Sequence, residues 1–214
     1  TGIAAARARL AEADPGLDKG PRDVDLPPWQ KGRYGTAVGR AVHAVLQSVD
    51  LAAEQHDLAW AAAAQAAAEE VLGRESVIEA LARSALRAPT VARGAHRPHW
   101  KEVYVGVPFG DGVLEGYIDL LFADDEGLVV VDYKTDSWRS DTDLDAKVQR
   151  YRLQLAAYAY AVAAVVGTPV VRAVLVFLSP AGAVERELSD LPAAIADVRV
   201  AAGEMAGDPP PRWP

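Results

Sequence analysis

Acidic residues and a lysine interrupt two apolar, strand-like runs in the middle of this sequence. The runs are EGYIDLLF, with Asp119 at its centre, and VVVDYKTD, with Asp132 and Lys134 two residues apart. Since side chains alternate along a strand, Asp132 and Lys134 point to one face and the flanking valines to the other. Burying ionisable groups without partners costs on the order of several kcal/mol. We therefore expect compensating ligands, most simply a divalent metal ion and a phosphate.

The chemistry open to these three residues is metal-assisted work on a phosphate. Carboxylates such as Asp119 and Asp132 suit Mg²⁺ or Mn²⁺, because hard cations take oxygen ligands. Lys134 could stabilise charge that builds on a phosphoryl group, or hold a water nucleophile. A D-x-K triplet also fits an exposed strand edge, with an ion pair worth at most about 1 kcal/mol. The apolar run before the triplet favours instead a sheet that is covered on both faces.

Four further residues could complete such a site. Gln154 and Tyr158 lie four residues apart on a predicted helix and share a face, from which they could orient a water or contact a phosphate; Tyr158 in the core is the alternative. His43 lies among small and apolar residues and is either a metal ligand or a packing residue. Glu102, at the start of a predicted strand, could face the metal site or pair with Arg40 or another arginine.

Helices are expected in the first part of the chain, residues 35–99. Apolar periodicity and the alanine content predict them over 34–50, 51–72 and 76–88. Ser76 is the expected N-cap of the third, with Glu79 completing a capping box, and Pro89 ends the helical half. The poorly patterned residues 1–34 are interpreted as a linker or arm.

Strands and two further helices are expected in residues 100–206. The predicted strands are 100–109, 113–122, 128–133, 170–178 and 184–188, and the helices are 146–166 and 192–206. A polar, acid-rich loop precedes the helix 146–166, which Gly167 and Pro169 end. Residues 207–214 form a tail. This order predicts an α/β fold with a mixed central sheet flanked by helices and an N-terminal helical segment.

Composition limits the class of protein. The 214 residues suffice for one domain with a full core. Without cysteine the chain has no disulfide, thiolate zinc site or iron–sulfur cluster, which fits a reducing, cytoplasmic setting. No apolar run reaches the roughly 20 residues of a membrane span, so no membrane partner is expected. The start at Thr1, with Met205 as the only methionine, predicts a fragment of a longer polypeptide.

The charges of the chain argue both against and for binding to nucleic acid. The net charge of −8 argues against a broad, nonspecific nucleic-acid binder. The stretch from Arg83 to Lys101, however, holds five basic residues, two histidines and no acids. It could follow a phosphate backbone, or it could be a solvated helix face that runs into a loop.

In chain order, five segments resemble one family. They are GRAVHAVL, KEVYVGVPF, EGYIDLLF, VVVDYKTD and QLAAYAYAV. Together they are similar to the RecB-type nuclease domain of the PD-(D/E)XK superfamily, found at the C-terminus of UvrD-like helicases and in AddAB/AdnAB-type complexes. The resemblance spans about residues 35–166 and implies a restriction-endonuclease-like fold for residues 35–206.

The resemblance also implies a role for each candidate residue: metal ligand, catalytic lysine, or supporting residue of the site. These are, in that order, His43, Asp119 and Asp132; Lys134; and Gln154, Tyr158 and Glu102. The implied function is a Mg²⁺- or Mn²⁺-dependent deoxyribonuclease domain of a helicase–nuclease in DNA repair or recombination. The implied partners are DNA and an ATP-dependent helicase motor on the same polypeptide, since the chain itself has no Walker-type motif. Some relatives carry a cysteine-bound iron–sulfur cluster, which this chain cannot.

Two other functions compete with this one. A noncatalytic DNA-guiding or partner-docking module of a helicase complex would bind without cutting, and the intact Asp119, Asp132 and Lys134 argue against it. A glycosidase-like hydrolase with paired carboxylates would need aromatic platforms, and only 7% of the residues are aromatic.

Overall fold

One mixed sheet of five strands forms the centre of the structure, a computed structural model that describes residues 36–53, 57–110 and 112–201. The strands are β1 (His99–Phe109), β2 (Gly112–Asp124), β3 (Gly127–Lys134), β4 (Val170–Phe177) and β5 (Val184–Glu187). Their order in space is their order along the chain, with β3 and β4 parallel and the other neighbours antiparallel. The predicted arm 1–34 and tail 207–214 lie outside the described residues.

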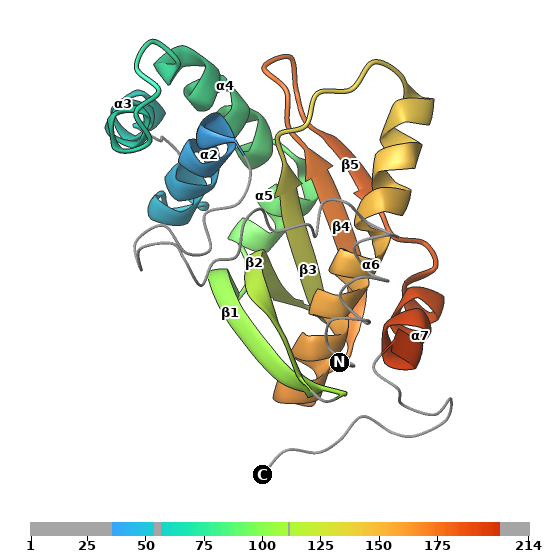
Figure 1. Cartoon of the computed structure of the whole chain (residues 1–214). Coiled ribbons are helices and arrows are strands. Elements are labelled where there is room, and N and C mark those ends of the chain that lie inside the picture. The colour runs from blue at the N-terminus through green and yellow to red at the C-terminus, as the bar shows by residue number, and fades with distance from the viewer. Residues whose placement is uncertain (1–35, 54–56, 111, 202–214) are drawn as a thin grey trace.

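Helices cover both faces of this sheet (Figure 1). They are α2 (Ala37–Ser48), α3 (Leu58–Ala68), α4 (Glu75–Leu86), α5 (Pro89–Ala95), α6 (Asp141–Val166) and α7 (Leu191–Ala201). Helices α2 to α5 pack on one face, and α6 and α7 pack on the other. Helix α6 makes the crossover that the parallel strands β3 and β4 require. The expected α/β class with a mixed, flanked sheet is confirmed. None of the described helices has the length and apolar character needed to cross a membrane.

Strand β3 is buried on both faces, as its valine run predicts. Val129 and Val131 pack into the core shared with α2 to α5, whereas Val130 packs into the core shared with α6 and α7. Asp132 and Lys134 follow Val130 along the α6 face because strand side chains alternate. Two hydrophobic cores therefore hold the end of β3 in place, which fixes where these two polar side chains emerge.

The alternation of faces breaks at Asp119. Ile118 packs with α6, yet Leu120, two residues later, packs with the helices of the opposite face. On β1, Glu102 lies opposite, between the register pairs of Lys101 and Val103, and has a left-handed φ of 51°. A non-glycine residue with such a φ is strained. The sheet is therefore irregular at the point where Glu102 and Asp119 face each other.

Two helices in the helical part, α3 and α4, differ from the expectation. Helix α3 is shorter than the predicted 51–72, because Asp57 caps it by accepting from the backbone N–H of Trp60. Ser76 lies inside α4, which begins at Glu75 without a side-chain cap, and Glu79 pairs with Arg83 instead of reaching back. The predicted capping box is therefore wrong.

Pro89 begins a helix instead of ending the helical half. It occupies the first turn of α5, where its fixed φ and missing N–H carry no penalty. The next residue, Thr90, donates from both its backbone N–H and its hydroxyl to the carboxylate of Glu185 on β5. The acceptor is distant in sequence, so local patterns do not reveal this helix.

Helix α6 begins at Asp141, five residues before the predicted start. Ser140 caps it by accepting from the backbone N–H of Asp143, and both Asp141 and Asp143 lie in the first turn. Acids there are stabilised by the positive end of the helix dipole. The expected acid-rich loop is therefore partly the first turn of this helix. Its predicted end is confirmed, with Gly167 left-handed at the C-cap. The last predicted helix, 192–206, corresponds to α7, which covers residues 191–201. Residues 202–206 lie outside the described part.

Candidate active site

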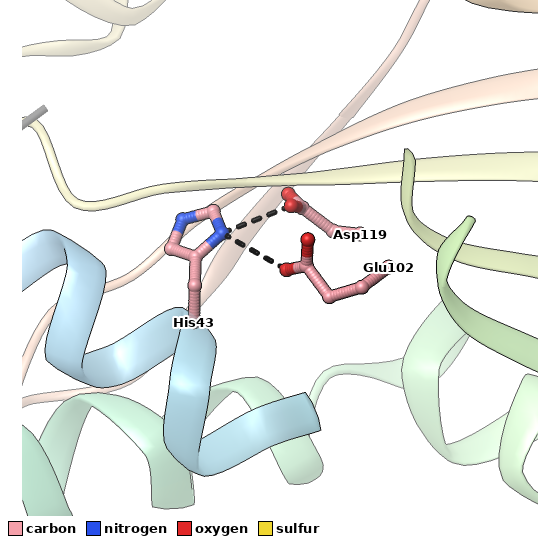
Figure 2. A group of neighbouring side chains, drawn as sticks. All are labelled: His43, Glu102 and Asp119. Atoms are coloured by element: carbon pink, nitrogen blue, oxygen red, sulfur yellow. Dashed lines mark hydrogen bonds and ion pairs between the residues drawn. The ribbon is translucent and has the colours of Figure 1, made fainter. Parts of the chain in front are cut away.

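His43, Glu102 and Asp119 converge from three different elements (Figure 2). His43 comes from α2, Glu102 from β1 and Asp119 from β2. Nδ1 of His43 lies 2.9 Å from Oδ1 of Asp119 and 3.9 Å from Oε1 of Glu102. One ligand atom from each of the three lies within 4.8 Å of the others. Of the two readings of Glu102, the structure places it in this group, while Arg40 pairs with Glu69.

Asp119 also links this group to β3. Its Oδ2 accepts a hydrogen bond of 2.6 Å from the backbone N–H of Tyr133. The register pairs of β2 and β3 end at Leu120 and Val131, so the Asp119 side chain replaces the next strand-to-strand bond. The Tyr133 ring in turn meets the His43 ring edge-on, with centroids 6.0 Å apart. The carboxylate is therefore held from both sides by α2 and β3.

Asp132 and Lys134 lie on the α6 side of this break. Asp132 is buried, and Nζ of Lys134 lies 2.8 Å from its Oδ2. That contact is an ion pair by distance, but it lacks hydrogen-bond geometry, and Oδ2 has no other hydrogen-bond partner among the described residues. The three-residue group contains Asp119 but not Asp132. Asp132 thus presents a buried carboxylate whose charge is balanced on this side by the Lys134 ammonium group alone.

Gln154 and Tyr158 extend this arrangement from α6. Nζ of Lys134 donates to Oε1 of Gln154 at 3.2 Å, and Nε2 of Gln154 donates to the hydroxyl of Tyr158 at 3.0 Å. Gly116 of β2 leaves room for Tyr158, because a Cβ there would lie 2.6 Å from its ring. Burial is the largest cause that raises the pKa of Tyr158, so its hydroxyl stays protonated. The two residues share the expected helix face. Gln154 contacts Lys134 directly, and Tyr158 contacts Gln154.

Tyr151 is a contributor that the sequence did not single out. Nζ of Lys134 lies 4.0 Å from the centroid of its ring, a cation–π distance. The hydroxyl of Tyr151 donates to Oδ2 of Asp136 at 2.8 Å. Tyr151 is three residues before Gln154 and seven before Tyr158, which places all three on one helix face. That spacing is the signal that could have revealed it.

The titration of these groups reflects crowded carboxylates. Burial lowers the pKa of His43, but Asp119 above all outweighs it and raises the value from 6.5 to about 9. Burial, with the charge of Asp119, raises the pKa of Glu102 to about 7. Burial also raises the pKa of Asp132, against the opposing charge of Lys134. Acids with raised pKa values at one point in the sheet favour an added cation.

The donor set fits a hard divalent cation. Two carboxylates and an imidazole converge, and a third carboxylate, the buried Asp132, lies on the other side of the break beside Lys134. Oxygen-rich sets of this kind suit Mg²⁺ and Mn²⁺. The group of His43, Glu102 and Asp119 could therefore bind a metal ion.

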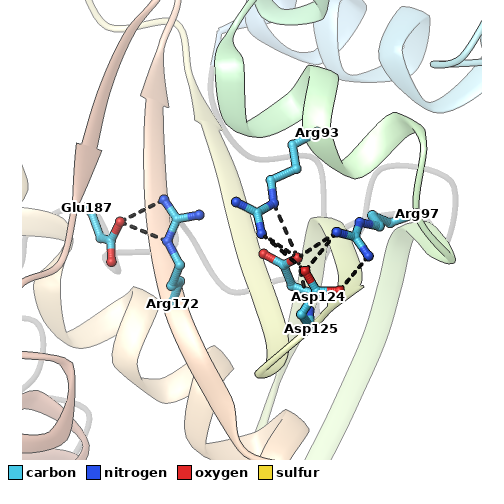
Figure 3. A network of polar contacts seen from close by, with 6 residues as sticks. All are labelled: Arg93, Arg97, Asp124, Asp125, Arg172 and Glu187. Carbon is cyan, nitrogen blue, oxygen red and sulfur yellow. Dashed lines mark hydrogen bonds and ion pairs between the residues drawn. The ribbon is translucent and has the colours of Figure 1, made fainter.

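The basic stretch from Arg83 to Lys101 is mostly engaged with other groups. Arg93 and Arg97 pair with Asp124 and Asp125 at 2.7 Å each, beside a separate pair of Arg172 with Glu187 (Figure 3). Arg83 pairs with Glu79, and Lys101 donates to the backbone carbonyl of Val49. Of the two readings of this stretch, these partners favour the solvated surface over a path for a phosphate backbone.

Comparison with known proteins gives relatives of one kind. A family model described as the PD-(D/E)XK nuclease superfamily matches residues 21–211. The chain is 35% identical over 154 residues to an ATP-dependent helicase/nuclease subunit from Desulforudis audaxviator; the match covers 63% of this chain and 12% of that protein. It is 47% identical over 55 residues to the protein of the same name from Anoxybacillus flavithermus, with 25% of this chain and 4% of that protein covered.

The chain thus spans only a small part of the length of these curated relatives. A solved structure described as "Crystal structure of SSO0001" aligns with 83% of this chain and 87% of its own, at 18% identity and a TM-score of 0.36. The family model, in contrast, matches most of the sequence and includes every strand of the sheet and all the residues of the group in Figure 2. The RecB-type resemblance and the restriction-endonuclease-like fold expected from the sequence are confirmed, and the chain belongs to the PD-(D/E)XK nuclease superfamily.

Proposed function

We propose that this chain is the nuclease domain of a helicase–nuclease and that it hydrolyses DNA phosphodiesters with Mg²⁺ or Mn²⁺. The observation that carries the proposal is the meeting of His43, Glu102 and Asp119 at the sheet break, with Asp132 and Lys134 on its other side. We assign residues 35–206 to the catalytic domain, with residues 35–99 as its helical part, and expect it to act in the cytoplasm.

The proposed roles follow from where each side chain lies. Asp119, His43 and Glu102 would hold the metal ion, and the buried carboxylate of Asp132 would be a further ligand. A bound Mg²⁺ or Mn²⁺ would supply Lewis-acid activation of a water and offset negative charge on the phosphoryl oxygens. Including Glu102 among the ligands extends the set of His43, Asp119 and Asp132 that the family resemblance implies.

Lys134 would orient the attacking water and offset charge that develops on the phosphate. Its ammonium group is well placed for this task because Gln154 and the ring of Tyr151 hold it from two directions. Tyr158 holds Gln154 in turn. Such preorganised charge needs no rearrangement during the reaction, which is where most of its catalytic effect arises. We propose Gln154 and Tyr158 as residues that position Lys134.

The proposed cellular role rests on the relatives. Two of them are described as ATP-dependent helicase/nuclease subunits, which supports DNA as the substrate and a helicase motor as the partner, with a role in DNA repair or recombination. We propose that the motor lies on the same polypeptide, as the small covered fraction of those relatives allows. A noncatalytic DNA-guiding or partner-docking module is the alternative function.

A cleavage assay separates these functions. The purified chain would be incubated with single-stranded and duplex DNA in Mg²⁺, in Mn²⁺ and in EDTA. We expect cutting only with metal, and none from Asp132→Ala or Lys134→Ala at unchanged circular dichroism. Arg172→Ala, which removes an ion pair remote from the site, serves as the matched control. DNA binding without metal-dependent cutting would instead support the noncatalytic module.

A further inference from the structure

Two tyrosines lie exposed on the β1–β2 hairpin next to the candidate site. Tyr104 and Tyr117 are direct partners in the strand register, and the two residues are 55% and 56% exposed. Their ring centroids are 5.4 Å apart and the rings are tilted by 58°. Exposed aromatic rings are usually scattered singly, so a paired arrangement on a strand ladder is a specific feature of this surface.

The Tyr104 ring is held in a fixed orientation. It lies across Gly106, where an added Cβ would be 2.9 Å from its hydroxyl oxygen and 3.3 Å from Cζ. Its hydroxyl donates to Oε2 of Glu115, the register partner of Gly106, at 3.0 Å. The glycine and the hydrogen bond therefore hold the ring along the hairpin, where more than half of Tyr104 remains exposed. A surface prepared in this way loses little conformational entropy when a flat ligand stacks on it.

The pair is continuous with the candidate metal group. Tyr104 and Tyr117 each lie two residues from Glu102 and Asp119, respectively, which is about 7 Å along a strand. They point away from the α6 side, because their strand neighbours Val105 and Ile118 are buried there. They therefore lie on the side of the sheet from which α2 brings His43. A chain bound at the metal group has these rings within reach of its next unit.

The surroundings favour bases over phosphates as the groups bound on the rings. Glu115 lies on the same face and would repel a phosphate placed there. Arg93 and Arg97, which lie elsewhere, are paired with acids. Every nucleobase has a π-face that stacks on an aromatic side chain, but in a duplex these faces are already covered by neighbouring base pairs. Aromatic rings beside an acid thus match an unpaired strand and not a double helix.

We propose that Tyr104 and Tyr117 form a stacking platform for the unpaired bases of single-stranded nucleic acid, adjacent to the phosphodiester bound at the metal group. This inference rests on the proposed nuclease function and gives its substrate class as a single strand. The platform sets the path of the strand along the β1–β2 hairpin, while the metal group binds the phosphate.

The first test measures binding without cleavage. A fluorescent single-stranded oligothymidine and a blunt duplex of equal length would be titrated with the full chain in EDTA. We expect Tyr104→Leu with Tyr117→Leu to weaken single-strand binding about tenfold to a hundredfold, as loss of base stacking does, and to leave duplex binding unchanged. The Tyr104→Phe, Tyr117→Phe pair keeps both rings and should stay within about threefold of the parent. Trp60→Leu, an exposed aromatic on α3, is the matched control and should have no effect.

A second test does not depend on affinity or on variants that fold. An oligonucleotide that carries 5-iododeoxyuridine would be crosslinked to the parent chain by light, and the modified peptide identified by mass spectrometry. Crosslinks at Tyr104 or Tyr117 support the platform. Crosslinks only elsewhere, an unchanged single-strand affinity of the double Leu variant, an equal loss for duplex, or an effect of Trp60→Leu would each overturn it.

The outcomes separate this inference from the function on which it rests. If the parent chain cuts DNA with Mg²⁺ but the double Leu variant binds single strands as the parent does, the platform is wrong and the nuclease stands. If the rings crosslink to the bases but no metal supports cutting, the platform stands as a binding site and the nuclease function fails.

Discussion

The carboxylate of Asp119 takes the place of a strand-to-strand hydrogen bond with Tyr133. Its Oδ2 accepts from the backbone N–H of Tyr133 at 2.6 Å, directly beyond the last register pair of β2 and β3. The other oxygen of the same carboxylate contacts His43. One side chain therefore both closes the gap between two strands and faces the proposed metal position, so fold and chemistry depend on the same group.

This dual use predicts different outcomes for two substitutions of Asp119. Asp119→Asn keeps an oxygen that can accept from Tyr133, so we expect a folded protein without metal-dependent cleavage. Asp119→Ala leaves that buried N–H unsatisfied, which costs about 1–3 kcal/mol of unfolding free energy. Urea denaturation in EDTA measures the difference between the variants. Equal stability of the Asn and Ala variants would show that the bond to Tyr133 contributes nothing.

Tyr151 is predicted to act through Lys134. Tyr151→Leu removes the ring under the ammonium group, a cation–π contact worth about 0.5–2 kcal/mol. We expect kcat to fall about threefold to thirtyfold with little change in KM, because the ring does not face the proposed substrate path. Tyr151→Phe loses only the bond to Asp136 and should retain most activity.

The Tyr151 prediction is checked by steady-state cleavage at saturating Mg²⁺. Val165→Ala, at an exposed position near the end of the same helix, controls for general effects on α6. A rise in KM at constant kcat would contradict the assignment, since it would place Tyr151 in substrate binding.

The sequence was sufficient to predict most of the sheet. Strand periodicity places Asp132 and Lys134 on one face, and the valine run before them predicts burial on both sides. Each of these inferences depends on residues close together in the chain. The same holds for the left-handed Gly167 that ends α6, because a helix C-terminus needs a residue that tolerates positive φ.

The features that were not predicted depend on contacts distant in sequence. Glu102 adopts a left-handed backbone inside a β-forming segment, because it faces Asp119 across the hairpin where the sheet changes face. Helix α5 relies on a carboxylate from β5, and Arg93 and Arg97 of the basic stretch are neutralised by acids about 30 residues away. The contact of Tyr151 with Lys134 requires knowing which face of α6 meets the sheet. Local pattern carries none of this information.

Metal binding should release a proton from His43. Its pKa of about 9 means that the imidazole is protonated at neutral pH without metal, whereas a metal ligand must be neutral. At pH 7 we expect release of roughly one proton per Mn²⁺ from His43 and about half a proton more from Glu102, whose pKa is about 7. Between pH 7 and 9 the affinity should rise up to about tenfold per pH unit. Calorimetry in two buffers of different ionisation enthalpy measures the release.

The free energy of unfolding of the metal-free protein should also depend on the protonation of His43. Because the folded pKa of His43 lies above 6.5, its contribution to stability is fully present below pH 6.5 and is lost as pH rises through about 9. His43→Asn should reduce the proton release by about one proton per Mn²⁺, and His96→Asn, at the exposed C-cap of α5, should leave the release unchanged. Proton release from the His43→Asn variant equal to that of the parent would refute the assignment.

Glu102 is predicted to lower the free energy of unfolding of the metal-free protein. Its pKa rises to about 7 in the folded state, so the ionised carboxylate is disfavoured there; the penalty is absent below about pH 4.5 and complete above pH 7. We expect Glu102→Gln to gain on the order of 1–2 kcal/mol of unfolding free energy at pH 8 in EDTA. Glu102→Gly should gain as much or more, because glycine also relieves the left-handed backbone.

Metal should reverse this order, because a ligand that binds only the folded state stabilises it. At pH 8, Mn²⁺ should raise the thermal midpoint of the parent more than those of Glu102→Gln and Glu102→Gly, because their metal-ligand sets lack one carboxylate. Glu115→Gln, which alters an acid on the same hairpin outside the metal group, is the matched control and should gain as much from Mn²⁺ as the parent. A parent chain that is more stable than Glu102→Gln in EDTA, or a Mn²⁺ response that Glu102→Gln leaves unchanged, would remove Glu102 from the proposed ligand set.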